Sequence, residues 1–151
     1  MKRCRLIDLA LLPFIFCVVI LRLLGKAFNL TYNQISVVFN LWLQGALLTL
    51  SGMAPAAAAV YKLCTSGSAL WLAATVLLLA YAAVYIFGFI RMLRHYHLPF
   101  DDAFWLCVKD LEELAKKWHT TYEMVNLIIF VLLFLVLSGA NIWLAYHITQ
   151  L

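Results

Sequence analysis

The chain has 151 residues, of which 66% are hydrophobic and only 12% are charged, and its mean hydropathy is +0.97. A soluble domain carries about 25% charged residues, so the composition excludes a soluble globular protein and indicates an all-α integral membrane protein. The formal net charge of +4 is too small and too scattered for a nucleic-acid surface. In a membrane protein, basic residues first report topology.

One stretch of the sequence occurs twice, 90 positions apart. Phe14–Tyr32 and Phe104–Tyr122 align without a gap, and their shared apolar positions fall on one helical face. The identical pairs are Phe14/Phe104, Cys17/Cys107, Val18/Val108, Leu21/Leu111, Leu24/Leu114, Lys26/Lys116, Thr31/Thr121 and Tyr32/Tyr122. The pattern predicts an internal two-copy repeat within a single membrane domain, 1–151.

Each copy is expected to hold two helices, and one further helix lies between the copies. The first copy is residues 6–52, the connector with the middle helix is 53–100, and the second copy is 101–148. Runs of about 20 apolar residues are long enough to cross a bilayer. The expected helices are 6–28, 32–50, 69–90, 101–118 and 122–147, of which 32–50, 69–90 and 122–147 are expected to span.

The boundaries of the second helix follow from local signals. Thr31 is placed to act as its N-cap. Ser51, Gly52 and Pro55 are expected to end it, because proline removes a helical hydrogen bond. The stretch 53–68 then serves as an alanine-rich connector.

The helix 101–118 is amphipathic, with Phe104, Val108, Leu111, Ala115 and Trp118 on one side and charges on the rest. Each charge would cost roughly 2.5–3.5 kcal/mol at the bilayer centre. This helix is therefore expected to lie along the interface.

Its copy, 6–28, is apolar all round, and two interpretations stay open: an interfacial or re-entrant helix, or a fourth span. If it does not cross, ten of the eleven basic residues lie on the N-terminal side, and only Lys62 lies opposite. That distribution obeys the positive-inside rule best. It favours the non-crossing arrangement in a bacterial-type cytoplasmic (inner) membrane.

A polar stripe runs along the helix 32–50. Asn33, Ser36, Asn40 and Gln44 follow 3-4-4 spacing and share one face. In hydrocarbon these groups need partners, so the face is expected to contact other helices or, alternatively, to line a hydrated pathway.

A second cluster, His95, His97, Asp101 and Asp102, joins the middle helix to the helix 101–118. Imidazole and carboxylate side chains can hold a divalent metal, but this spacing matches no specific signature. The alternative is a solvated turn in which Asp101 and Asp102 favour a helix N-terminus.

Basic residues near the helix ends are candidates for contact with lipid headgroups. These are Arg22, Lys26, Arg91, Arg94, Lys116 and Lys117.

No enzymatic motif with a recognisable spacing occurs in the sequence. The leading hypothesis is a small multi-pass protein without catalytic activity or cofactor. It acts in the lipid bilayer by assembly, as a homo-oligomer or as a subunit of a larger membrane complex. The alternatives are a homo-oligomeric channel or membrane-permeabilising effector, and a metal-dependent membrane-surface enzyme.

The topology is testable with reporter fusions. Fusions after residue 66 and after residue 151 are expected to report the extracytoplasmic side, and a fusion after residue 98 the cytoplasm, because this orientation keeps the basic ends inside. A cytoplasmic signal from the C-terminal fusion would contradict the arrangement.

Overall fold

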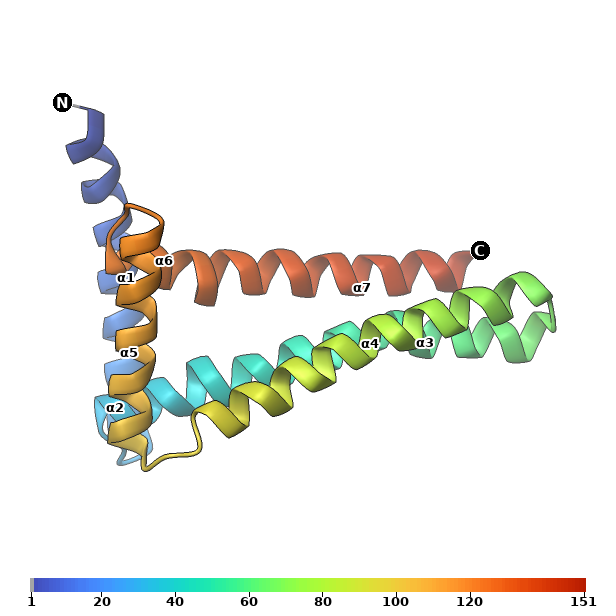
Figure 1. Ribbon diagram of the computed structural model, residues 1–151, viewed down its shortest axis with the longest axis horizontal. Coiled ribbons are helices and arrows are strands. Elements are labelled where there is room, and N and C mark those ends of the chain that lie inside the picture. Colours follow the sequence, from blue (N-terminus) through green and yellow to red (C-terminus); the bar gives the residue numbers. More distant parts are fainter. Residues whose placement is uncertain (1) are drawn as a thin grey trace. The chain divides into compact units, whose positions relative to one another are not determined.

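The computed structural model describes the backbone of residues 2–151 and the side chains of residues 11–151, and in this part of the chain it contains helices and no strand (Figure 1). The elements are α1 (Lys2–Ala27), α2 (Tyr32–Ser36), η1 (Val37–Leu43), α3 (Gln44–Ser66), α4 (Ala69–His95), α5 (Phe100–Lys117), α6 (Tyr122–Leu127), η2 (Ile128–Leu133) and α7 (Phe134–Gln150). The segments η1 and η2 are π-helical, a wider winding that is rare and often found at functional sites.

Three helices in the described part of the chain are long and apolar enough to cross a membrane. They are Tyr32–Ser66, Ala69–His95 and Tyr122–Gln150. All three expected spans are therefore present, and each is longer than the sequence pattern predicted. The 18 residues of α5 are amphipathic instead.

The expected end of the second helix is wrong. The stretch 53–66, predicted to be a connector, continues α3, and Pro55 lies buried inside that helix. Alanine is the strongest helix former, and proline is tolerated in membrane helices because neighbouring groups satisfy the freed carbonyl. The chain turns only at Gly67, whose φ is +63°.

The chain divides into two compact units. The first, Met1–Leu43 with His95–Leu133, contains α1, α2, η1, α5, α6 and η2; the second, Gln44–Arg94 with Phe134–Leu151, contains α3, α4 and α7. We call them the crossed unit and the three-helix unit.

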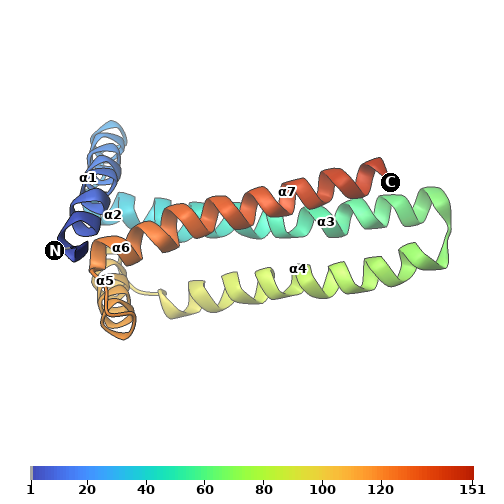
Figure 2. The ribbon, with the colours of Figure 1, turned by 90° about the horizontal axis from the view of Figure 1, so that it is seen from above.

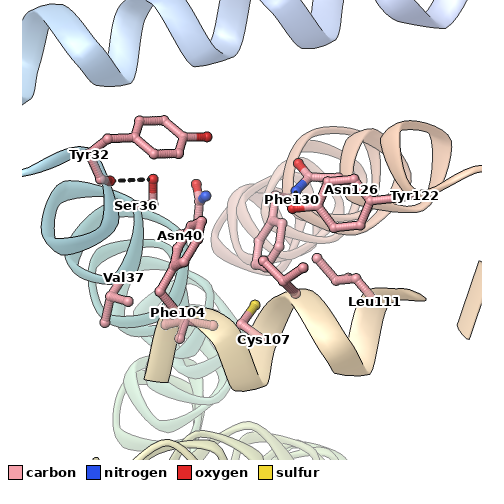
Figure 3. A pocket seen from close by; sticks show the side chains of 12 residues that line it. Tyr32, Ser36, Val37, Asn40, Phe104, Cys107, Leu111, Tyr122, Asn126 and Phe130 are labelled. Atoms are coloured by element: carbon pink, nitrogen blue, oxygen red, sulfur yellow. Dashed lines mark hydrogen bonds between the residues drawn. The ribbon is translucent and has the colours of Figure 1, made fainter. Parts of the chain in front are cut away.

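In the crossed unit, α1 and α5 lie on opposite sides of the paired starts of the two long helices. Both α1 and α5 contact α2 and α6, and Figure 3 looks along α2 and α6 with α1 above them and α5 below. Buried Leu111, Ala115 and Val125 form the core between α5 and α6. Close van der Waals packing of these apolar side chains holds α5 against α6.

Two aromatic contacts in the crossed unit are reciprocal. The rings of Phe14 and Tyr122 meet edge to face with centroids 6.0 Å apart. The rings of Tyr32 and Phe104 do the same at 5.8 Å. Phe104 is 90 positions after Phe14, and Tyr32 is 90 positions before Tyr122, so the second pair repeats the first with the two copies exchanged. The helix α1 therefore contacts the long helix that follows α5, and α5 contacts the long helix that follows α1.

The turns after α1 and α5 have the same hydrogen bonds. Asn29 and His119 have φ of 54° and 51°, a left-handed conformation in which Asn and His are enriched. The Leu30 amide donates to the Gly25 carbonyl at 2.8 Å, and the Thr120 amide donates to a carbonyl five residues back at 3.0 Å. This is the Schellman arrangement, which satisfies carbonyls at a helix end.

The next helix begins in the same way after each turn. The predicted N-cap at Thr31 is confirmed: its hydroxyl accepts from the Gln34 amide, and Gln34 Oε1 accepts from the Thr31 amide in return. Thr121 caps α6 by accepting from the Met124 amide. Such a cap is worth about 1 kcal/mol.

In the three-helix unit, α3 and α7 pack closely, and α4 runs back along α3 after the turn at Gly67 (Figure 2). Ala56 and Ala59 are buried on α3. Small residues let helix backbones approach in a membrane, where packing replaces the hydrophobic drive.

A chain of side-chain hydrogen bonds links all three helices of this unit. Asn141 of α7, only 1% exposed, donates to Ser51 Oγ of α3 at 3.3 Å. It accepts from Tyr81 OH of α4 at 2.7 Å. The Tyr81 and Tyr85 hydroxyls are 2.8 Å apart and share a further bond.

The helix α4 is held away from α3 by large side chains. A Cβ added to Gly52 would lie 2.5 Å from the Tyr85 ring, and one added to Gly45 would lie 2.9 Å from both Phe89 and Met92. Because Gly45 and Gly52 have no side chain, these large side chains of α4 lie directly against the α3 backbone.

The apolar side of α5 largely matches its prediction. Leu111 and Ala115 are buried, and Phe104 and Val108 are half-buried, but Trp118 is 51% exposed. Trp118 follows the last residue of α5, where the turn at His119 redirects the chain.

Leu111→Asp is expected to destabilise the protein by a few kcal/mol, because it places an unpaired carboxylate among packed apolar side chains. Exposed Glu113 provides the control, since Glu113→Ala should stay within about 0.5 kcal/mol. Unfolding in mixed detergent micelles measures both. Equal losses would show that the buried face is assigned wrongly.

Candidate functional site

A small polar pocket lies in the crossed unit, between α2 with η1 on one side and α6 with η2 on the other, with α5 closing its base (Figure 3). Its volume is about 30 Å³. The lining residues are Tyr32, Ser36, Val37, Asn40, Leu41, Phe104, Cys107, Val108, Leu111, Tyr122, Asn126 and Phe130.

Two of the pocket's polar side chains bond to their own helices. Ser36 Oγ donates to the Tyr32 carbonyl at 2.7 Å, and Asn126 Nδ2 donates to Tyr122 OH at 3.3 Å. The amide of Asn40 lies across the pocket from Asn126 (Figure 3). Hydroxyl and amide groups thus face the space from both long helices.

The chemistry of this pocket is neutral hydrogen bonding. None of its lining side chains is a carboxylate, an imidazole or an ammonium group. One water needs roughly 10–15 Å³ of such volume and two to four polar partners, so the space suits one or two waters. The pocket has the volume and the polar partners to hold water beside the amides where the long helices begin, and its lining offers no acid–base pair.

The thiol of Cys107 is at the α5 side of the pocket. Burial, and secondly the nearby Asp110 carboxylate, raise the pKa of Cys107 to about 11. The thiolate is the nucleophilic form of cysteine. Cys107 is therefore protonated at neutral pH and is a poor nucleophile.

Asp110 of α5 bonds to two residues of the segment that precedes this helix, His95 and Tyr96. Asp110 Oδ2 accepts from Tyr96 OH at 2.9 Å and lies 3.0 Å from His95 Nε2. Burial raises the pKa of Tyr96 above its ordinary value, and Cys107 and Asp110 add to the rise. Tyr96 therefore stays a neutral donor to the carboxylate.

The predicted polar stripe is divided among several environments. Asn33 Nδ2 donates to Asp101 Oδ1 of α5 at 2.9 Å. Ser36 and Asn40 line the pocket. Gln44 lies in the next unit, where its Oε1 is buried without a hydrogen-bond partner in the described part of the chain.

The four candidate metal ligands are not brought together. His95 pairs with Asp110, and Asp101 accepts from Asn33. Asp101 and Asp102 lie in the first turn of α5, where no side chain caps the helix. In the part of the chain that the structure describes, no group of three or more His, Cys, Asp or Glu side chains is placed to hold a metal ion.

Among the predicted headgroup contacts, Arg22 has an aromatic neighbour: its guanidinium carbon lies 5.7 Å from the centre of the Tyr32 ring. Cations are attracted to aromatic faces at this range. The remaining basic residues of that group are exposed, namely Lys26, Arg91, Arg94, Lys116 and Lys117.

The sequence reasoning missed the bond between Ser51 and Asn141. The two residues are 90 positions apart, the same offset that relates Phe14 to Phe104, but such an offset matches equivalent positions and does not predict that they touch.

No protein family, curated protein or solved structure matches this chain in the comparisons made.

Proposed function

We propose that this protein is a non-enzymatic membrane module that acts by assembly, as a homo-oligomer or as a subunit of a larger complex. The observation that carries the proposal is the bare surface of the spans. Only 11% of the most apolar stretch of α4, and 6% of that of Tyr122–Gln150, is buried within the chain.

An apolar stripe on α4 supports this assembly. Leu72, Val76 and Leu79 are 55%, 60% and 51% exposed and follow the i, i+4, i+7 spacing of one helical face. The polar side chains that link the spans, by contrast, bond to one another inside the three-helix unit. A neighbouring helix that contacts this stripe therefore packs on apolar side chains and does not line a polar channel.

The repeat is part of the same proposal. Residues 6–52 and 101–148 are two copies of one unit, in which a first helix (α1 or α5) is followed by a span. The matching turns at Asn29 and His119 support it. So do the reciprocal ring pairs of Phe14 with Tyr122 and Tyr32 with Phe104. An arrangement of this kind resembles an isologous dimer interface, in which residue i contacts j and j contacts i.

The equivalence of α1 and α5 also favours the non-crossing topology. The helix α1 contacts α2 and α6 as α5 does, and the charges of α5 keep it out of the bilayer. We therefore place α1 at the interface on the side of the basic residues. The location that follows is a cytoplasmic (inner) membrane of bacterial type.

The channel alternative has one feature in its favour. Asn40 faces a polar pocket where the long helices begin, and a pore needs such groups along its length. An assembly that conducts ions would make liposomes leaky, whereas a packing module would leave them tight.

Native mass spectrometry from lipid nanodiscs tests the proposal. The protein is expected to appear as a multiple of its 17.2 kDa chain mass or bound to another protein. Val76→Trp should shift it toward the single-chain mass, because a bulky side chain clashes with a packed helix but not with lipid. Leu12→Trp, at an exposed position of α1, is the matched control. A single chain at every concentration in its native membrane would contradict assembly.

A further inference from the structure

The three-helix unit contains an apolar groove between α3 and α4, near the α4 end that carries Arg91 and Arg94. Its volume is about 310 Å³, at the lower end of the range for ligand pockets. The lining residues are Gly45, Leu48, Thr49, Val84, Tyr85, Gly88, Phe89, Met92 and Leu137.

The groove exists because α4 is propped away from α3 at two points. The Tyr85 ring lies against Gly52, and the Phe89 and Met92 side chains lie against Gly45. The two glycines are seven residues apart, about 10.5 Å along a helix. On α4, Gly88 lies between the props, and a Cβ added there would meet no atom within 4 Å.

The groove suits an apolar occupant, because the side-chain hydroxyls of Thr49 and Tyr85 that line it are already bonded. Thr49 Oγ1 donates to the Gly45 carbonyl at 2.8 Å, and the Tyr85 hydroxyl pairs with that of Tyr81 at 2.8 Å. The groove lies on helices that are apolar enough to cross a membrane. A polar ligand there would lose its hydrogen bonds to water without replacement.

Two arginines near the end of the groove indicate that the headgroup of a bound lipid is anionic. Arg91 is three residues beyond Gly88 and seven beyond Val84, so it continues the same edge of α4. Arg94 follows one turn later, and both arginines are exposed. Among side chains that the structure describes, neither has a carboxylate partner. Arginine binds phosphate in a two-pronged geometry.

We propose that the groove between α3 and α4 binds one acyl chain of an anionic glycerophospholipid, whose phosphate is bound by Arg91 with Arg94 beside it. The acyl chain fills the space in front of Gly88. The lipid thereby completes the packing between two helices that touch only through large side chains. Anionic lipids are enriched on the cytoplasmic side, where the positive-inside rule places Arg91 and Arg94.

The experiment is native mass spectrometry of the protein from nanodiscs holding equal amounts of phosphatidylglycerol and phosphatidylcholine. The wild type is expected to retain phosphatidylglycerol preferentially. Arg91→Gln should reduce that preference about fivefold, since it removes one basic residue beside an anionic headgroup. Retention of phosphatidylcholine should fall less, because its choline ammonium offsets the charge of its phosphate.

Gly88→Leu should lower retention of both lipids, because it fills the groove without a clash. Leucine is also a better helix former than glycine, so helicity measured by circular dichroism should be kept. Gly139→Leu is the matched control, because Gly139 is equally open but does not line the groove.

Three results would overturn the proposal. Unchanged lipid retention in both Arg91→Gln and Gly88→Leu would show that no lipid occupies the groove. Equal retention of the two lipids by the wild type would contradict an anionic lipid as the occupant, because both lipids carry a phosphate and differ in net headgroup charge. A loss of oligomer in Gly88→Leu without a loss of lipid would show that a helix of a second copy fills the groove.

Discussion

The three-helix unit depends on how a buried asparagine is satisfied in hydrocarbon. An amide in a bilayer core has no water to bond, so Asn141 must find both a donor and an acceptor within the protein. Tyr81 and Ser51 supply them, one from each of the other two helices. Because a shift along any helix would break one of these bonds, the network fixes the register of all three. Gly52 then allows Tyr85 to lie directly on α3.

In the crossed unit, the two long helices begin between α1, which is apolar, and the amphipathic α5. Here α2 and α6 pack against both α1 and α5, and Leu111 and Val125 are buried between α5 and α6. The neutral groups of Ser36 and Asn126 are gathered around a pocket of water size. Most of these buried polar groups are hydrogen-bonded within their own unit, Gln44 Oε1 being an exception, while the outer surfaces of the spans stay apolar and available to lipid or to neighbouring chains.

Much of this architecture was predictable from the sequence, because it follows from periodicity and capping. The three spans, the buried face at Leu111 and the cap at Thr31 each depend on residues close together in the chain. The continuation of α3 through Pro55 depends on two opposing local preferences, and the helix propensity of the adjacent alanines outweighs the helix-breaking effect of the proline. The partners of Asp110 and Asn141 were not predictable in this way, because such pairings depend on tertiary distances that helical spacing does not contain.

A double-mutant cycle on Asn141→Leu and Tyr81→Phe tests the central claim that this amide links the spans. The free energy of unfolding is measured for the wild type, both single variants and the double variant in mixed micelles. Interhelical hydrogen bonds in membranes average about 0.6 kcal/mol and reach about 1.7. A coupling energy in this range is expected, because either change alone removes the same bond. Strictly additive losses would contradict it and show that Asn141 and Tyr81 stabilise the protein independently.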